Sequence, residues 1–430
     1  MRDGRVRERL WDNPPSETSK EFFVNRFAFF MATVVIAAML NGCSSNSSSA
    51  DAPPDLKVVA GDSSVTLTWT ADPDVEYWVF YAKGSSVTTS NWLSLGGSAI
   101  TKATTPYTIR GLVNGTTYSF TINGRKNGGP GGAGAPSQVA TPRLAGATWV
   151  VGAPLGTGRL NGVGVANTTI ATVGAGGIIF SSVNDAAATT LTNPAAPADL
   201  NAILNGGLGF VAAGAAGTVI FTSDALTWTA KTSGTVADLY AIASPGTGSF
   251  AAFGAAGTII TSTDGSTWAV VTSPTAKNLY SAVYGNAKYV AVGAEGTLIT
   301  SADGVTWTAV AFNTTRDLRA VAFGSYSTTV GTTTTTTNTF VALGAAGTLL
   351  TSSDGVTWTL QPAMSAKNIA SVVYGGQFVA VGNAGSIFTS ADGITWQSQT
   401  SGTTNDLTSV ARTATGYVAV GAAGTYLTSQ

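Results

Sequence analysis

The chain has 430 residues, of which 44% are hydrophobic and 10% charged, and its net charge is -1. This length allows about two or three domains with sizeable cores, and the near-neutral charge excludes an extended basic surface for nucleic acid. There is no histidine and only one cysteine. A histidine base, a disulfide framework and a thiolate metal site are therefore excluded, and we expect neither a metal nor a cofactor. Strand-forming residues between many glycine-rich turns predict an all-β protein.

Residues 27–40 form an apolar run that is short for a membrane span of about 20 residues but suits a secretory signal. The run is followed by Asn41-Gly42-Cys43, which contains the single cysteine of the chain. This ending resembles the bacterial lipoprotein signal. The resemblance implies cleavage after residue 42 and a lipid on Cys43, which would attach the protein to a membrane. The alternative is an ordinary signal peptide with an accidental cysteine.

The residues after Cys43 bear on where the protein is held. Ser44 follows the cysteine, rather than the aspartate that retains lipoproteins at the inner membrane of enteric bacteria, so the resemblance favours the outer membrane. Residues 1–42 are therefore expected to be the signal segment. Residues 43–52, which are rich in serine, are expected to be a flexible tether.

Residues 53–142 contain short segments in which apolar and polar residues alternate, as in the strands of a two-sheet sandwich. The run Tyr-Thr-Ile-Arg-Gly-Leu-Val-Asn-Gly-Thr-Thr-Tyr-Ser-Phe-Thr-Ile at 107–122, together with Trp69 and the Ser-Gln-Val-Ala-Thr-Pro at 137–142, resembles the fibronectin type III signature. The resemblance implies that Trp69 lies in the core and that Tyr118 forms a tyrosine corner. Such modules are mostly spacers or adhesive units. Two further tryptophans fit either core packing or exposed binding: Trp78 and Trp92.

Residues 143–430 repeat one pattern seven times, with a period of about 40 residues that is typical of propellers and solenoids. The segment Tyr289–Trp307 is a clear copy. It reads as a Tyr-Val-Ala-Val-Gly strand, a tight turn, a Thr-Leu-Ile-Thr-Ser strand and an Asp-Gly turn before Thr-Trp. A strand such as Leu279-Tyr-Ser-Ala-Val precedes it, and Asp-Gly between apolar runs signals a hairpin. Each repeat therefore predicts a sheet of four strands.

The two ends of this repeat region complement each other. The last copy stops at Thr428-Ser429-Gln430 after three strands, whereas Thr148-Trp149-Val-Val is a fourth strand that belongs to no repeat of its own. Pairing the two would remove a free sheet edge. We therefore expect residues 146–430 to form a seven-bladed β-propeller, closed three strands plus one at Trp149, after a fibronectin type III β-sandwich.

The segment Ser-Ala-Asp-Gly-Val-Thr-Trp at 301–307 and its copies resemble the Asp-box of sialidases and other proteins with bacterial neuraminidase repeats. They also resemble the repeats of photosystem II assembly factors. The aspartate is expected to accept N–H groups of its own turn and the tryptophan to wedge between neighbouring blades, on the side away from an active face. The residues given this structural role are Asp224, Asp264, Asp303, Asp354, Asp392, Trp228, Trp268, Trp307, Trp358 and Trp396.

A count of carboxylates tests the sialidase alternative. After residue 142 there are ten Asp and one Glu. Five are Asp-box residues and four precede a first strand, which leaves Asp185 and Glu295. Glycosidases usually need a dedicated acid with a second carboxylate or a tyrosine nucleophile, and sialidases add an arginine cluster that has no counterpart here. We therefore predict a non-catalytic, lipid-anchored envelope protein. A glycan-directed hydrolase and an assembly factor for a membrane complex remain alternatives.

The loops from each fourth strand to the next first strand are the expected binding face. They and the adjoining first strands combine cations, aromatics and amides: Tyr240, Lys277, Asn278, Tyr280, Arg316, Asp317, Arg319, Lys367 and Asn368. Such a patch suits an envelope protein or a polysaccharide, although Asp and Asn that cap turns beside solvated Lys and Arg would look the same. The insertion at 325–339, with six consecutive threonines, is expected to be a flexible or sugar-modified surface loop.

Overall fold

The computed structural model of the chain describes residues 47–183, 187–195, 198–330 and 333–429. The described residues divide into two compact units, the first made of 47–59 and 65–141 and the second of 60–64 and 142–429. Apart from short 3-10 turns, their regular elements are strands, so the all-β prediction is confirmed. Within these ranges there is no helix whose length and apolar character would let it cross a membrane. Cys43 and Asp185 lie outside the described residues.

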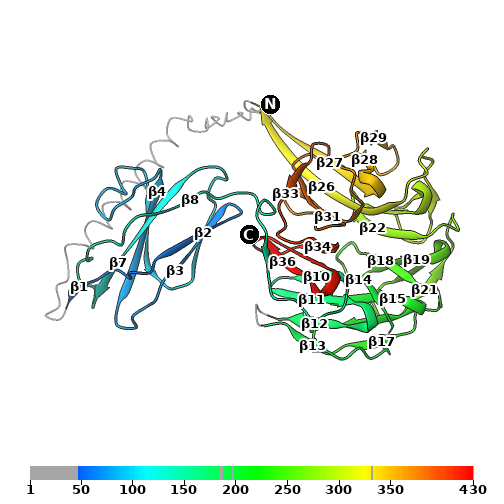
Figure 1. Cartoon of the computed structure of the whole chain (residues 1–430), viewed down its shortest axis with the longest axis horizontal. Helices are drawn as coiled ribbons and strands as arrows, with labels where there is room; N and C mark the ends of the chain where they lie inside the picture. The colour runs from blue at the N-terminus through cyan, green and yellow to red at the C-terminus, as the bar shows by residue number, and fades with distance from the viewer. Residues whose placement is uncertain (1–46, 184–186, 196–197, 331–332, 430) are drawn as a thin grey trace, which may run out of the picture. The chain divides into compact units, whose positions relative to one another are not determined.

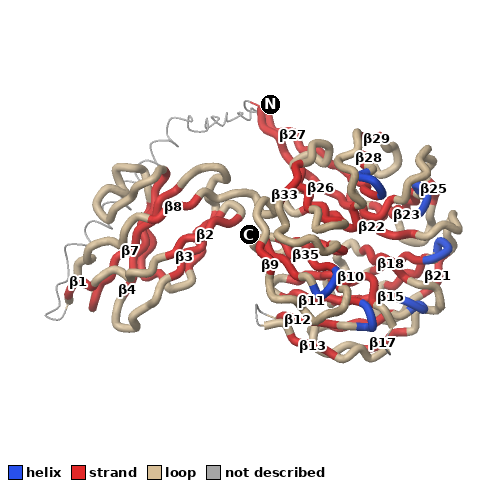
Figure 2. Tube along the Cα trace, in the orientation of Figure 1, coloured by secondary structure: helices blue, strands red, loops and turns tan. Residues whose placement is uncertain are grey.

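The first unit contains two sheets, whose strands are coloured red in Figure 2. One sheet comprises β2 (Lys57–Gly61), β3 (Ser64–Thr68) and β6 (Tyr107–Arg110). The other comprises β1 (Ser48–Ala50), β4 (Glu76–Lys83), β5 (Ser98–Ala103), β7 (Tyr118–Lys126) and β8 (Gln138–Ala140). Apolar residues of both sheets, among them Leu67, Val79 and Phe120, form one buried core, as alternating strands of a sandwich require.

Two expectations for the first unit agree with the structure and one changes. Trp69 is buried in the core, and the Tyr118 hydroxyl accepts the Val113 N–H at 3.2 Å, which is the expected tyrosine corner. The expected tether at 43–52, however, is not all tether. Its residues Ser48–Ala50 form β1, which pairs with Gly124–Lys126 of β7, because the open edge of β7 offers hydrogen-bonding groups that serine and alanine backbones can satisfy.

The second unit contains seven four-stranded antiparallel sheets within the described residues. The first strands are β10 (Leu160–Ala166), β14 (Leu200–Asn205), β18 (Leu239–Ala243), β22 (Leu279–Gly285), β26 (Leu318–Val330), β30 (Ile369–Tyr374) and β34 (Leu407–Arg412). The second strands are β11 (Thr169–Gly174), β15 (Phe210–Gly214), β19 (Phe250–Gly254), β23 (Lys288–Gly293), β27 (Thr333–Gly344), β31 (Phe378–Gly382) and β35 (Tyr417–Gly421). The third strands are β12 (Ile179–Ser182), β16 (Val219–Thr222), β20 (Ile259–Ser262), β24 (Leu298–Ser301), β28 (Leu349–Ser352), β32 (Ile387–Ser390) and β36 (Tyr426–Ser429). The fourth strands are β13 (Thr189–Leu191), β17 (Thr229–Lys231), β21 (Ala269–Val271), β25 (Thr308–Ala309), β29 (Thr359–Gln361), β33 (Gln397–Gln399) and β9 (Val150–Val151).

A 3-10 turn joins the second strand to the third in six of these sheets, and these turns are blue in Figure 2. They are η1 (Ala175–Gly177), η2 (Ala215–Gly217), η3 (Ala255–Gly257), η4 (Ala294–Gly296), η5 (Ala345–Gly347) and η6 (Ala422–Gly424). Because strands alternate in direction, these turns lie at the same end of each sheet as the loops that lead to the next first strand. We call this end, which carries η1 to η6, the latch face. The Asp-box turns lie at the opposite end, which we call the box face.

The sheets follow one another so that the last contacts the first. Each first strand contacts the next one along the chain, and β34 and β35 of the last sheet contact β10 of the first; Figure 1 labels these strands along the chain's colour gradient. In the seventh sheet, β9 pairs with β36 through Val150 and Thr428 and through Val151 and Leu427. The core lies between adjacent sheets, where the apolar faces of the strands pack.

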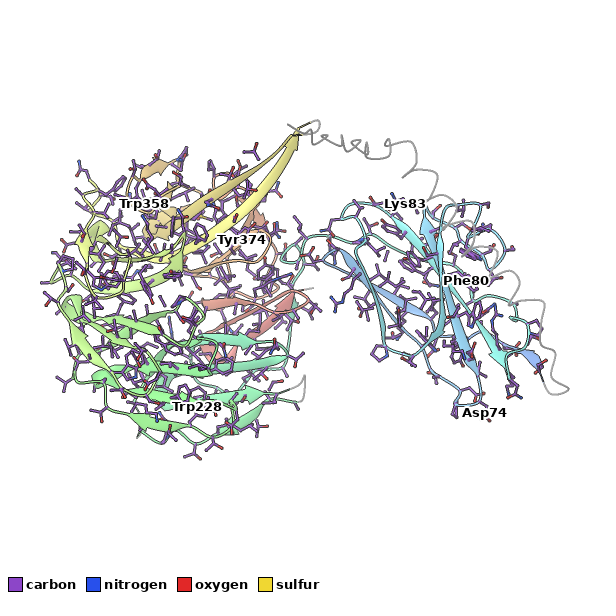
Figure 3. The ribbon with its side chains drawn as sticks, turned by 180° about the vertical axis from the view of Figure 1, so that it is seen from behind. Asp74, Phe80, Lys83, Trp228, Trp358 and Tyr374 are labelled. Atoms are coloured by element: carbon purple, nitrogen blue, oxygen red, sulfur yellow. The ribbon has the colours of Figure 1, made fainter. Side chains whose placement is uncertain are left out.

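The insertion at 325–339 differs from the expected loop. Strands β26 and β27 continue through it as one antiparallel ladder that reaches Val330 and Thr333, and the two strands form the long hairpin of Figure 3. Strand β28 pairs only with Phe340–Leu343, so the rest of the hairpin is two strands wide. The Tyr374 hydroxyl donates to the Ser325 carbonyl at 2.7 Å and fixes its base.

Candidate functional site

The Asp-box turns use their polar groups internally. Asp303 Oδ1 accepts the N–H groups of Val305 at 2.8 Å and Thr306 at 2.7 Å, and the Ser301 hydroxyl donates to the same oxygen. The Trp307 indole N–H donates to the Gly304 carbonyl at 3.0 Å. The backbone N–H bonds favour the charged carboxylate, and they lower the pKa of Asp224 and Asp354 to about 2. These carboxylates thus accept hydrogen bonds within their own turns.

The Asp-box tryptophans lie between adjacent sheets, as expected. Trp307 packs edge to face on Phe253 of the preceding sheet, with ring centroids 5.2 Å apart, and Trp228 lies in a cluster with Ala171 and Val173. One box departs from the pattern, because Ala225 replaces glycine at a left-handed φ of 60°. In that box the buried Trp228 indole N–H has no partner.

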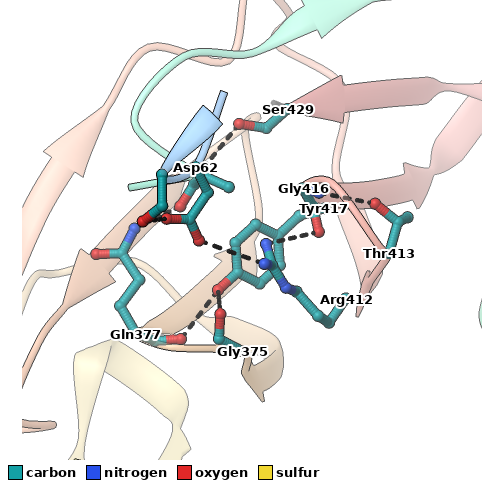
Figure 4. Close-up of polar contacts among 11 residues, drawn as sticks. Asp62, Gly375, Gln377, Arg412, Thr413, Gly416, Tyr417 and Ser429 are labelled. Atoms are coloured by element: carbon teal, nitrogen blue, oxygen red, sulfur yellow. Dashed lines mark hydrogen bonds and ion pairs between the residues drawn. The ribbon is translucent and has the colours of Figure 1, made fainter. Parts of the chain in front are cut away.

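The seventh box is assembled from two distant parts of the chain. The Gly146 N–H donates to the Ser429 hydroxyl at 2.8 Å, and the Trp149 indole N–H donates to the Gly146 carbonyl at 2.7 Å. These bonds repeat those that Gly304 makes with Ser301 and Trp307. Ala145 stands where the other boxes have aspartate. Ser429 appears in Figure 4 above Tyr417, whose hydroxyl lies 3.1 Å from the carbonyls of Gly375 and Gln377.

On the latch face, an Asp or Asn before six of the seven first strands connects two sheets. The Asp238 carbonyl accepts the Ala255 N–H of its own sheet at 2.8 Å, and its carboxylate accepts the Ala216 N–H of the preceding sheet at 2.8 Å. Ala216 has a left-handed φ of 52°, which points its N–H at the carboxylate. Six junctions share this side-chain bond, here called the Asx latch: Asp199, Asp238, Asn278, Asp317, Asn368 and Asp406.

Every first strand of the second unit carries a β-bulge just after its first residue, where its register with the second strand shifts. A bulge leaves one residue outside the ladder and re-aims its side chain. The seven bulged residues, here called the bulge ring, are Asn161, Asn201, Tyr240, Tyr280, Arg319, Ala370 and Thr408. Three of them, Tyr240, Tyr280 and Arg319, belong to the patch expected from the sequence. The other four also follow the Leu or Ile that begins each first strand. Their place in the repeat could therefore have identified them from the sequence.

The bulge ring divides into two sectors. In the first sector each side chain donates to the first-strand carbonyl of the next sheet, from Thr408 to Leu160 at 2.6 Å, from Asn161 to Leu200 at 3.0 Å and from Asn201 to Leu239 at 3.0 Å. These bonds connect neighbouring sheets, and each of the three side chains already has a hydrogen-bond partner. In the second sector, from Tyr240 to Ala370, none of the described side chains makes such a bond.

The second sector brings together an aromatic pair and a cation. The rings of Tyr240 and Tyr280 lie 5.9 Å apart, and the Arg319 guanidinium lies 4.7 Å from the centre of the Tyr280 ring, within the range of a cation–π contact. The same guanidinium pairs with Asp317 at 2.8 Å. Burial raises the pKa of the Tyr240 phenol, and the Asp238 charge adds to this. The Tyr240 phenol therefore stays neutral at physiological pH.

The other expected face residues have separate roles. Asn278 and Asn368 are Asx latches, which agrees with the capping alternative. Lys277 forms an ion pair with Glu295 at 2.7 Å. The charged groups of Arg316 and Lys367 make no ion pair or hydrogen bond with the described residues, so these two cations are available to a ligand. The described part of the chain has no group of three or more side chains suited to hold a metal.

Trp78 and Trp92 in the first unit fitted either core packing or exposed binding from the sequence. Both side chains are half-buried. The Arg125 guanidinium covers the Trp78 ring at 3.6 Å, and Trp92 contacts Phe80 with ring centroids 5.8 Å apart. Each ring therefore already has an intramolecular partner, which favours the packing alternative over an open binding surface.

Comparison with known proteins supports the two-part fold. Residues 51–140 match the fibronectin type III domain. A search of curated proteins found no match to the chain. Among solved structures, YCF48 bound to D1 peptide aligns with a TM-score of 0.52 at 16% identity, over 65% of this chain and 94% of that one.

Two further solved structures are lyases. A streptogramin B lyase aligns with a TM-score of 0.56 at 9% identity, over 66% of this chain and 99% of that one. Virginiamycin B lyase from Staphylococcus aureus has a TM-score of 0.51 at 10% identity, over 66% and 99%. At such identities the likeness shows a β-propeller-like fold alone, because one fold supports many functions.

Proposed function

We propose that the protein is a non-catalytic binding protein of the bacterial envelope. In this proposal the second unit is a seven-bladed propeller, closed three strands plus one by β36 and β9, that presents its latch face to a protein segment. A lipid on Cys43 holds the chain at the outer membrane, and the fibronectin type III domain acts as a spacer.

The observation that supports this proposal is the asymmetry of the bulge ring. A purely structural ring would repeat the side-chain bonds of Asn161 and Asn201 at every junction. From Tyr240 to Ala370 the ring instead carries two half-buried tyrosines and the exposed Arg319, and the free cations Arg316 and Lys367 lie on loops of the same face. Tyr and Arg are the residues that most often dominate the energy of protein interfaces.

The carboxylates near the bulge ring are already paired, which favours a binding role over a catalytic one. Glu295 is exposed and paired with Lys277, and Asp238 and Asp317 each accept a backbone N–H as an Asx latch. A general acid or base would need a free carboxyl group near a substrate. YCF48, which shares the fold, is known in complex with a D1 peptide, and that is consistent with a propeller of this kind taking a peptide.

Site-specific photocrosslinking in the producing cell tests this proposal. A benzophenone amino acid is placed at Tyr240 on the latch face or, as a control, at Val305, which is 60% exposed on the box face. We expect a protein adduct from position 240 in the membrane fraction. Arg319→Ala together with Tyr280→Ala should lower its yield about tenfold, since two contact residues are lost.

Three results would contradict parts of the proposal. Adducts of equal yield from both positions would mean that the latch face is not the binding face. Turnover of a glycan by the purified protein would contradict the non-catalytic role. A Cys43→Ser variant that stays in the membrane fraction would contradict the lipid anchor.

A further inference from the structure

Two repeats carry a lysine at the same position, but the two lysines differ in their partners. Lys277 directly precedes an Asx latch, and its ammonium pairs at 2.7 Å with Glu295 of η4 in the same sheet. Lys367 also directly precedes an Asx latch, and Ala384 stands at the position that Glu295 holds in the fourth sheet. The Lys367 ammonium has no ion pair with any residue that the structure describes.

The backbone around the two positions is the same. In both sheets the carbonyl of the latch residue accepts an N–H from the following turn, at 2.9 Å from Ala294 and at 3.1 Å from Asn383. Glu295 and Ala384 come next in these turns, and both have a left-handed φ, of 53° and 50°. Both residues are exposed. The sixth sheet therefore repeats the geometry of the fourth but offers Lys367 no carboxylate.

Lys367 and Ala384 line one groove of about 710 Å³ on the latch face. Most of its remaining wall is formed by residues 398–404, which follow from β33 into the next loop and supply mainly hydroxyl and amide groups. A groove of this size suits a few groups of a ligand. It thus offers an unpaired cation among polar side chains to a ligand that brings its own acid.

A second groove shows that the shape belongs to the repeat and that the cation does not. It measures about 630 Å³ and is formed by the same turn and loop in the second sheet. Ala198 stands there at the position of Lys367. The cation in the wall of this second groove is Lys231, whose ammonium lies 5.8 Å from the centre of the Phe221 ring. Charge therefore distinguishes the groove at Lys367 from its structural counterpart.

We propose that the groove at Lys367 binds an acidic side chain of the partner protein segment, whose carboxylate pairs with the Lys367 ammonium as Glu295 pairs with Lys277. This inference rests on the proposed function and deepens it, because it names the chemistry of the segment. Arg316 precedes the latch of the intervening sheet and is the other unpaired cation of this face. It adds to the electrostatic attraction for an acidic segment.

An acidic side chain is favoured over the carboxylate of an acidic polysaccharide. The contact that the ligand would copy is made by a glutamate side chain. Among the described residues that line the groove, the one aromatic is Phe388, which is 7% exposed. A sugar ring therefore meets no open aromatic face on which to stack. A carboxylate on a short stem needs only the cation and nearby donors for a charge-assisted contact.

The substitution Ala384→Glu tests this inference because it supplies the acid from within the chain. The new carboxylate is expected to pair with Lys367, since Glu295 has the same left-handed backbone in the fourth sheet. The probe is a phage-displayed library of random linear peptides, selected on the full-length chain. Selected peptides should contain Asp or Glu. They should bind Ala384→Glu and Lys367→Ala at least about tenfold more weakly, because a charge-assisted contact is lost.

Matched variants separate charge from shape. Ala384→Gln adds nearly the same side chain without the charge and should weaken binding by less than about threefold. Lys231→Ala removes the cation of the second groove and should leave binding unchanged. A selected peptide whose acid is replaced by the amide should bind the unchanged protein about tenfold more weakly, and it should no longer distinguish that protein from Ala384→Glu.

The outcomes distinguish this inference from the proposed function. Peptides that depend on Tyr280 and Arg319 but bind Ala384→Glu as well as the unchanged protein would overturn the inference and leave the proposed function standing. Polygalacturonate that binds the unchanged protein and not Ala384→Glu, when no peptide is selected, would place a polysaccharide in the groove and contradict a protein segment in both. If no selected peptide depends on the latch face, both are wrong.

Discussion

Asp303 and Asp238 show how one side chain takes two roles in the same repeat. Asp303 accepts N–H groups two and three residues ahead in its own turn, so its role was predictable from the local sequence. Asp238 accepts an N–H from a residue 22 positions earlier, in the preceding sheet. The residues around Asp238 indicate only that its side chain could cap a turn. Its actual partner, the Ala216 N–H, is brought near by the packing of two sheets and could not be identified from the local sequence.

The Asp-box carboxylates predict a loss of stability in acid. The backbone N–H groups of Thr357 and Val356 lower the pKa of Asp354 from 3.8 to about 2. Since the folded pKa is below the unfolded one, the contribution of Asp354 to stability is present above pH 3.8 and is lost as the pH falls towards 2. Carboxyl-carbon NMR should give a midpoint near 2, and urea unfolding of Asp354→Asn should depend less on pH across this window. A midpoint near 3.8 would contradict the assignment.

Each first strand was predictable as an element, but its bulge was not. The pattern Leu-Tyr-Ala-Ile at 239–242 reads as a regular strand. The bulge is set by the pairing of Leu239 with Gly254 and of Ala241 with Phe253, which depends on the second strand and its turn. The patch of Tyr240, Tyr280 and Arg319 was therefore found from composition, whereas the polar sector with Asn161 and Thr408 was missed.

The Asx latches predict a measurable loss of folding stability when one of them is removed. Asp238→Ala removes the acceptor for the Ala216 N–H and should destabilise the second unit by about 1 kcal/mol, as the loss of a turn or helix cap does. Asp238→Asn is the matched control and should be nearly neutral, because Asn278 and Asn368 make the same bond elsewhere. Urea unfolding measures both. Equal losses for the two variants would show that charge, rather than the hydrogen bond, matters at this junction.

For the whole molecule, the repeats were the most informative part of the sequence. Their period gave the number of sheets, and the fourth strand near Trp149 indicated where the last sheet would find its missing strand. The insertion at 325–339 was misjudged, because threonine-rich segments lack the apolar alternation that marks a buried strand. In the structure β27 stays in register with β26 through the insertion, which agrees with the high β propensity of threonine.

The box of the seventh sheet combines Gly146 and Trp149 with Ser429 from the other end of the unit. We therefore predict that the stability of this sheet depends on Trp149. This side chain is buried among Val379, Val381 and Ile387 of the sixth sheet, so Trp149→Ala should cost about 3–5 kcal/mol. Hydrogen exchange should also become faster in β36 than in β20, because β36 loses its outer neighbour. A loss below about 1 kcal/mol with unchanged exchange in β36 would show that the pairing with β9 does not hold the sheet.

The bulge ring has a consequence for how such a protein acquires new partners. A bulged residue makes no ladder bond that the sheet needs, so its side chain can change while the strand pairing on both sides is kept. Each of the seven sheets has one such position at the start of its first strand. Substitution at these positions alone amounts to a combinatorial library on a constant scaffold.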